Sequence, residues 1–236
     1  MARRRGSKPK IDDELARTRE APATLPRLAL LAAAEAVITD KGFARATVED
    51  VAAYAGVAVD VVYAHFGGKG ALLRALCDHF AEQMLGVADQ ADEAGDGAAS
   101  PHAILDAAIR AAIDVVHDHA AVVRAILAHG DADPTLAGAL RRIGQRLATR
   151  VAQTIRTSRH RDADAVDERE IAFALLTALA LAHHAILVGD DSTGVPFPRA
   201  ELADEASRAL AAYLGGAARR GRAGLRTDGT NPPPRA

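Results

Sequence analysis

Apolar residues recur every three or four positions along most of this chain. The longest such series runs through Leu136, Leu140, Ile143, Leu147, Val151 and Ile155. An α-helix with one buried face has this spacing because it turns once every 3.6 residues. Strand-like alternation of apolar and polar residues does not occur over any length. The sequence therefore predicts an all-α protein of about nine helices.

Two helices and their ends are predicted near the start of the patterned region. The first should end at Lys41, because Lys followed by Gly42 is a typical C-terminal stop. Its buried face is predicted to hold Leu30, Leu31, Ala34, Val37 and Ile38. Thr47 and Asp50 then have the spacing of a capping box, with Asp where Glu or Gln is usual. The second helix should begin there and bury Val48, Val51, Ala52 and Ala55.

A third helix is predicted directly after a tight turn. Gly56 supplies the permissive backbone that a short turn between two crossed helices requires. We expect Val57, Val62 and Phe66 to complete a three-helix core. The opposite surface would then carry Ala58, Asp60, Val61, Tyr63, Ala64 and His65.

These patterns divide the chain into four parts. They are a flexible basic arm (1–24), a helix-turn-helix domain (25–80), a larger helical domain (81–220) and a disordered tail (221–236). A fourth helix is expected from Lys69 to about Val87, followed by a polar linker over residues 89–100. Ser100-Pro101 and Asp133-Pro134 each pair an N-cap side chain with proline, so each should start a helix.

Residues 166–188 are apolar nearly all round, and a helix of this kind is buried on every side. In a chain of 236 residues, one face is expected to pack on its own domain and another on a partner subunit. A final amphipathic helix is predicted over residues 199–218. Together, 166–188 and 199–218 form the predicted homodimer interface.

Charge and cysteine content restrict the setting of the protein. The formal net charge is −2, although arginines and lysines crowd both ends of the chain. The single cysteine, Cys77, excludes an internal disulfide and fits a reducing compartment. No apolar signal-peptide region follows the basic N-terminus, and the longest apolar run, residues 171–182, is shorter than the ~20 residues that cross a bilayer. We therefore expect a cytoplasmic protein without a membrane segment.

Three segments follow one another at fixed spacings between Leu28 and Leu73: "KGFARATVEDVAAYAGV", "VVYAHF" and "GKGALL". Together they resemble the TetR family of bacterial transcriptional regulators. The resemblance implies a helix-turn-helix domain followed by a helical ligand-binding and dimerisation domain. It also implies a two-fold dimer on a near-palindromic stretch of double-stranded DNA, released by a small-molecule effector. A repressor is then expected, rather than an enzyme, and no cofactor or metal.

The resemblance places Thr47, Tyr63, His65 and Lys69 against the DNA backbone. Their chemistry agrees, because free N–H groups at a helix start, polar side chains and a cation all favour phosphate. Base contacts would come from the exposed surface of the third helix. The predicted DNA-contacting set is Arg45, Thr47, Ala58, Val59, Asp60, Val61, Tyr63, Ala64, His65 and Lys69, with Arg3, Arg4 and Arg5 of the arm.

This surface departs from the family's pattern. Family members usually have Ser or Thr where Ala58 and Val61 stand, and often a polar residue at Val59. Asp60 has two interpretations. Its carboxylate could complement the helix dipole in place of the missing cap, or it could accept a hydrogen bond from cytosine N4 while Val61 touches a thymine methyl.

Because the third helix carries so little positive charge, DNA affinity has to come from elsewhere. The arm offers Arg3, Arg4, Arg5, Lys8 and Lys10, which could enter a flanking minor groove. The alternative is that the arm is a solvated disordered tail.

The effector pocket is predicted only loosely. His129, Phe173, Thr177 and His183 are proposed lining residues, because such sites are mostly apolar with a few polar groups. The histidines could also suggest a metal site, but adjacent residues such as His183 and His184 point about 100° apart on a helix. Cys77 fits a small buried residue better than a redox switch.

Two other functions remain open from the sequence. One is an all-α enzyme or ligand carrier with a vestigial helix-turn-helix, although no nucleophile with a placed base, facing carboxylate pair or Gly-rich phosphate loop occurs. The other is a protein-interaction module that dimerises through residues 166–188. Sequence preference for duplex DNA would separate both from a regulator.

Overall fold

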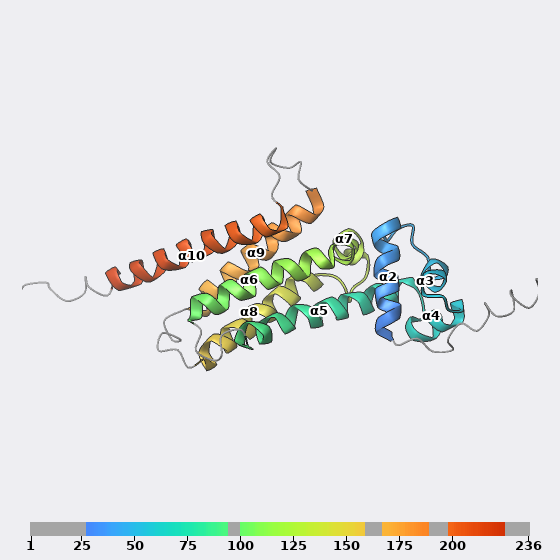
Figure 1. Ribbon diagram of the computed structural model, residues 1–236, viewed down its shortest axis with the longest axis horizontal. Coiled ribbons are helices and arrows are strands. Elements are labelled where there is room, and N and C mark those ends of the chain that lie inside the picture. Colours follow the sequence, from blue (N-terminus) through green and yellow to red (C-terminus); the bar gives the residue numbers. More distant parts are fainter. Residues whose placement is uncertain (1–26, 94–99, 159–166, 189–197, 225–236) are drawn as a thin grey trace, which may run out of the picture. The chain divides into compact units, whose positions relative to one another are not determined.

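The computed structural model describes residues 27–93, 100–158, 167–188 and 198–224. These residues form nine α-helices and one 3-10 helix, with no strand among them, so the predicted all-α fold is confirmed (Figure 1). The helices are α2 (Arg27–Lys41), α3 (Val48–Ala55), α4 (Val59–Phe66), α5 (Lys69–Glu93), α6 (Pro101–Asp118), α7 (Ala120–His129), η1 (Gly130–Ala132), α8 (Ala139–Thr157), α9 (Glu168–Val188) and α10 (Arg199–Gly224).

The chain separates into two compact units, one up to Ala75 and one from Leu76 onward. Helix α5 therefore contributes its first turns to the first unit and its remainder to the second. The sequence prediction put the boundary after residue 80, a few residues further along the same helix.

The first unit is built on α2, α3 and α4, which pack in sequence on one another. The apolar face predicted for α2 is buried, as are Val48, Val51, Ala52, Val62 and Phe66. Ala55 and Val57, also predicted for the core, are only half-buried. They flank Gly56, where the chain turns out of α3, so part of each side chain is left facing solvent.

The second unit packs α9 against α8 and α6, and α10 against α6. The helix expected after Ser100 begins as predicted, because the Ser100 hydroxyl accepts a hydrogen bond from the backbone N–H of Ala103 at 3.2 Å. Helix α5 continues to Glu93, beyond its predicted end near Val87. Residues 89–93, assigned to a linker from their polarity, include no glycine or proline and extend the helix.

The helix predicted to start at Asp133-Pro134 begins instead at Ala139. The Asp133 carboxylate accepts hydrogen bonds from the N–H and hydroxyl of Thr135 at 2.9 and 2.7 Å. This closes a local turn, as Asx side chains often do. Gly138 then adopts φ +66°, a left-handed conformation that separates the turn from α8.

Helix α10 runs to Gly224, past its predicted end, and takes in the first residues of the predicted tail. The rest of that tail and the basic arm with Arg3, Arg4 and Arg5 lie outside the described residues.

Helix α9 is not buried on every side within one chain. Ile171, Leu175 and Leu179 are buried, whereas Phe173 and Leu187 remain 49% and 56% exposed. Among the described residues it is the one helix long and apolar enough to cross a membrane, a test that core helices of soluble proteins also pass. The sequence prediction rests on the apolar run of residues 171–182, which is shorter than the helix.

Candidate nucleic-acid interface

A complete capping box starts α3. The Thr47 hydroxyl accepts a hydrogen bond from the Asp50 N–H, and the Asp50 carboxylate accepts one from the Thr47 N–H, both at 3.1 Å. Lys41 Nζ lies 2.6 Å from the other Asp50 carboxylate oxygen. The bond from Lys41, followed by that from the Thr47 backbone, lowers the pKa of Asp50. The shorter Asp side chain thus closes the box as the sequence predicted.

The turn between α3 and α4 is made by Gly56 at φ +68°. Its N–H points back to the carbonyl oxygens of Ala52 and Ala53, and the Val57 N–H is bonded to the Ala52 carbonyl at 3.0 Å. Ala58 is the N-cap of α4 and provides no side-chain hydrogen bond. Helix α4 therefore begins without a capping hydroxyl, as the sequence predicted.

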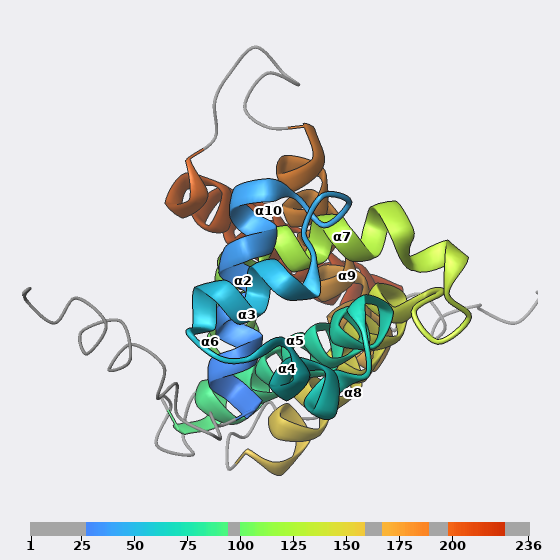
Figure 2. The same ribbon diagram turned by 90° about the vertical axis from the view of Figure 1, so that its right-hand side faces the viewer.

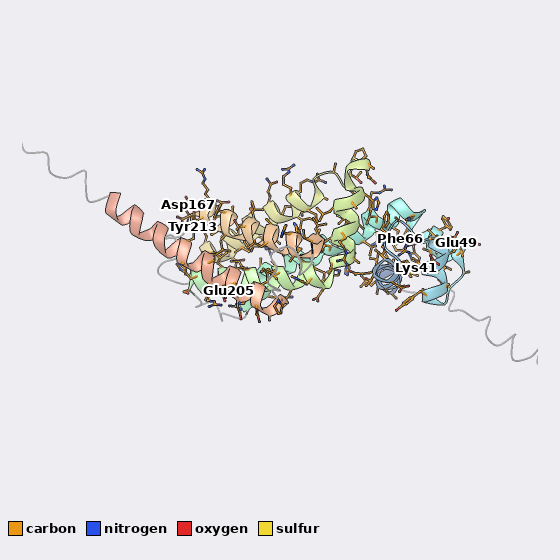
Figure 3. The ribbon with its side chains drawn as sticks, turned by 90° about the horizontal axis from the view of Figure 1, so that it is seen from above. Lys41, Glu49, Phe66, Asp167, Glu205 and Tyr213 are labelled. Atoms are coloured by element: carbon orange, nitrogen blue, oxygen red, sulfur yellow. The ribbon has the colours of Figure 1, made fainter. Side chains whose placement is uncertain are left out.

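Helix α4 buries Val62 and Phe66, and its other residues are half-buried or exposed. We call the group Ala58, Val59, Asp60, Val61, Tyr63, Ala64 and His65 the reading surface. Val59 and Val61 are half-buried and the others are exposed, Tyr63 by 45%. Figure 3 marks Phe66, at the end of the same helix, in the first unit. One helix face is thus free to enter a groove, and Asp60 is its only formally charged group.

The nearby cations are held by the protein itself. Arg45 follows α2 in the chain, and its Nε donates to the carbonyl of Lys41, the last residue of that helix, at 2.9 Å. Lys69 Nζ donates to the Ala44 carbonyl at 2.9 Å and lies 4.6 Å from the centre of the Phe43 ring. Of the predicted phosphate contacts, Thr47 belongs to the capping box that Lys41 joins, whereas Lys69 is bonded to the loop that precedes this box.

The described part of the first unit carries no net positive charge. Residues 27–75 contain five Lys or Arg and five Asp or Glu. Residues 2–10, in contrast, contain five Lys or Arg and no acidic residue. Nonspecific attraction to DNA scales with the phosphates that a protein neutralises, so residues 27–75 alone supply little of it.

The four residues predicted for the effector pocket come from α7 and α9, and their role in a pocket stays a prediction. His129 ends α7 and is exposed, Phe173 contacts the Tyr213 ring at 4.9 Å between centres, and Thr177 and His183 are half-buried on α9. Burial lowers the pKa of His183. None of the four lines the hollow of about 760 Å³ that the second unit contains between α5 and α8.

Sequence reasoning overlooked that hollow. Its charged wall comes from Arg142, Arg146 and Arg150, whose four-residue spacing puts them on one face of α8. That spacing is present in the sequence, but only the packing of α5 beside α8 shows that the arginines line an open hollow.

The described residues include no metal-binding cluster, and their one cysteine thiol is buried. No group of three or more potential ligands there is placed to hold a metal ion. Cys77 is buried on α5, and burial, with a smaller contribution from the Asp78 charge, raises the pKa of its thiol to about 11.

Comparison with known proteins finds one family whose sequence pattern matches the region of α2 to α4 and the start of α5. Residues 30–76 match the family described as bacterial regulatory proteins, tetR family. No curated protein sequence matches the chain.

Solved structures share the fold across most of the chain. The TetR-family transcriptional regulator PfmR from Thermus thermophilus is 19% identical, with a TM-score of 0.57 over 81% of this chain and 97% of that one. A transcriptional regulator from Rhodococcus sp. is 21% identical, with a TM-score of 0.60 over 80% and 96%. A TetR-like transcriptional regulator, also from Rhodococcus sp., is 22% identical, with a TM-score of 0.54 over 82% and 100%.

Proposed function

We propose that this chain, which belongs to the TetR family of bacterial transcriptional regulators through residues 30–76, is a homodimeric repressor that a small molecule releases from DNA. The observation that carries the proposal is the reading surface. A capping box fixes α3, a glycine turn fixes α4 against it, and one face of α4 is left exposed. A second helix held in this way is the element that enters the major groove in helix-turn-helix proteins.

Backbone contacts position the helix on the duplex. The start of α3 offers N–H groups and the Thr47 hydroxyl to one phosphate, while Tyr63, His65 and Lys69 reach others. Sequence would be read by Asp60 and Val61, through cytosine N4 and the thymine methyl group. The repulsion between Asp60 and phosphates weakens nonspecific binding, so discrimination between sequences is large relative to affinity.

The dimer interface is assigned to α9 with α10. Phe173, Leu181 and Leu187 of α9 are all more than 40% exposed, and Tyr213 of α10, marked in Figure 3, is 39% exposed beside Phe173. Large exposed apolar side chains on two neighbouring helices are typical of a subunit interface. Two copies would present two reading surfaces to half-sites about 34–36 Å apart.

Release by a small molecule would follow from differential affinity. A ligand that binds better to a dimer with wrongly spaced reading surfaces reduces DNA affinity by the ratio of its two affinities. Helix α5 belongs to both units, so a change in its position can be transmitted from one to the other.

A second candidate is a protein-interaction module, which the neutral charge of residues 27–75 and the apolar reading surface favour. It differs from a regulator in showing no preference among DNA sequences. One experiment therefore separates the two.

The test is selection of randomised duplexes by the full-length protein at roughly physiological salt, followed by sequencing of the retained pool. We expect a near-palindrome. Ala64→Glu, on the reading surface, should abolish the enrichment, whereas the matched Ala53→Glu, exposed on α3, should leave it. Recovery of no motif by folded dimer would overturn the proposal and favour the interaction module.

A further inference from the structure

The hollow of the second unit has the size of a small-molecule site. It measures about 760 Å³, within the roughly 300–1,000 Å³ usual for such sites. The later part of α5 lies beside α8 (Figures 1 and 2). It is lined by Glu82, Leu85, Gly86 and Asp89 of α5, and by Arg142, Gln145, Arg146, Thr149, Arg150 and Gln153 of α8.

Three arginines stand in a row along this hollow. Arg142, Arg146 and Arg150 follow at four-residue intervals, each about 6 Å further along the helix axis. The opposite face of α8 is buried, which fixes the row toward the hollow.

The two outer arginines are engaged by the protein. Arg142 donates to the backbone carbonyl of Thr135 at 2.8 Å, and Arg150 donates to the Asp89 carboxylate at 2.8 Å. Arg146, between them, makes no hydrogen bond or ion pair with any residue that the structure describes, and it is an exposed residue. Its planar fork therefore remains available for an oxyanion.

The balance of charge in the hollow favours an anion. Three arginines face two carboxylates, and one of these, Asp89, is already paired with Arg150. The other, Glu82, lies 3.8 Å from His79 Nδ1.

The wall opposite the arginines has an apolar stretch between its two carboxylates, Glu82 and Asp89. Leu85 and Gly86 are half-buried there, and a Cβ atom added to Gly86 would meet no other atom within 4 Å. The glycine thus leaves open space beside Leu85, where an apolar body could lie.

We infer that this hollow binds a small amphipathic carboxylate, with its head group on Arg146 and its apolar body against Leu85 and Gly86. That this ligand is the effector rests on the function proposed above. Binding itself does not depend on DNA.

The charge requirement is tested by calorimetric titration of the full-length protein with submicellar decanoate, with decanol as the uncharged probe. Decanoate should bind and decanol should bind far more weakly. Arg146→Gln should reduce decanoate affinity by about tenfold or more, since it removes a charge-assisted bond to the carboxylate. The matched Arg156→Gln, on the same helix but outside the hollow, should not. Absence of decanoate binding, equal binding of decanol, or unchanged binding by Arg146→Gln would each overturn the inference.

The location is tested by filling the hollow. Gly86→Leu places a side chain in the open space and should abolish decanoate binding. Unfolding of the ligand-free variant by heat should occur at the same temperature or higher, because leucine is a better helix former than glycine. Binding by a folded Gly86→Leu protein as strong as in the parent chain would place the ligand elsewhere and overturn the assignment.

Adding decanoate to the complex of protein and selected duplex tests the role as effector. Release of DNA by the parent protein, but not by Gly86→Leu, supports it. If decanoate binds but leaves DNA bound, the effector role fails and the binding site stands. If no duplex is ever selected, the proposed function fails, while the titration still decides the binding site.

Discussion

The ammonium of Lys69 donates a 2.9 Å hydrogen bond to the carbonyl oxygen of Ala44. This bond joins the first residue of α5 to the loop that precedes the capping box of α3. Two of the three ammonium protons are left for other acceptors. Lys69 can therefore brace the helix-turn-helix and contact a phosphate at the same time.

Lys69→Met should affect DNA binding in a way that salt reveals. Loss of one phosphate contact lowers the slope of log affinity against log salt by about 0.9. Lys69→Arg retains the charge and should retain the slope. Titration of the selected duplex at several salt concentrations measures both. An unchanged slope in Lys69→Met would restrict this residue to bracing the loop.

Deletion of residues 2–10 should flatten the same salt dependence more strongly. The segment carries five positive charges, and each phosphate that it neutralises contributes about 0.9 to the slope. A chain with these five residues changed to Ser is the control for length. If both variants keep the parent slope, the arm does not contact DNA.

Thr47→Ala should destabilise the first unit by about 1 kcal/mol, the usual cost of losing an N-cap. Thr47→Ser keeps the hydroxyl that accepts the Asp50 N–H and should stay close to the parent protein. Urea unfolding followed by circular dichroism gives the difference. Equal stability of the Ala and Ser variants would show that the capping bond contributes nothing measurable.

Cys77 should resist thiol reagents in the folded protein. With its pKa raised to about 11 by burial and by Asp78, roughly one thiol in a thousand is ionised at pH 8. A disulfide-exchange reagent at pH 8 should label no thiol in buffer and one per chain in denaturant. Rapid labelling of the native protein would mean that the α5 region opens readily.

The pH dependence of stability should include a contribution from His183. Burial lowers its pKa below the ordinary value of 6.5, so below about pH 7 the unfolded chain binds more protons than the folded one. The free energy of unfolding therefore falls as pH drops through this region. His183→Gln should make that fall shallower, whereas His184→Gln, at an exposed neighbouring position, serves as the control. Chemical unfolding between pH 7.5 and 5.5, within the ~5–8 range where histidine titrates, measures the slopes.

Local patterns were sufficient where a few neighbouring residues decide the structure. The stop at Lys41-Gly42, the Thr47 capping box and the Ser100 N-cap all form within four residues, and all three are present. Asp133-Pro134 carries the same kind of signal, but its carboxylate bonds to Thr135 and closes a turn. A side chain that can cap a helix can also cap a turn, so the local pattern alone does not choose between them.

By itself, the sequence determined the helical class, the family resemblance, the end of α2, the limits of α3 and the lack of Lys or Arg on the reading surface. These follow from spacing and composition within short segments. Tertiary structure decided that Lys69 is bonded to Ala44, that Phe173 and Leu187 stay exposed, and that Arg146 faces a hollow with no partner among the described residues. The physical reason is that such contacts join residues far apart in the chain, and only the packing of whole helices determines which side chains meet.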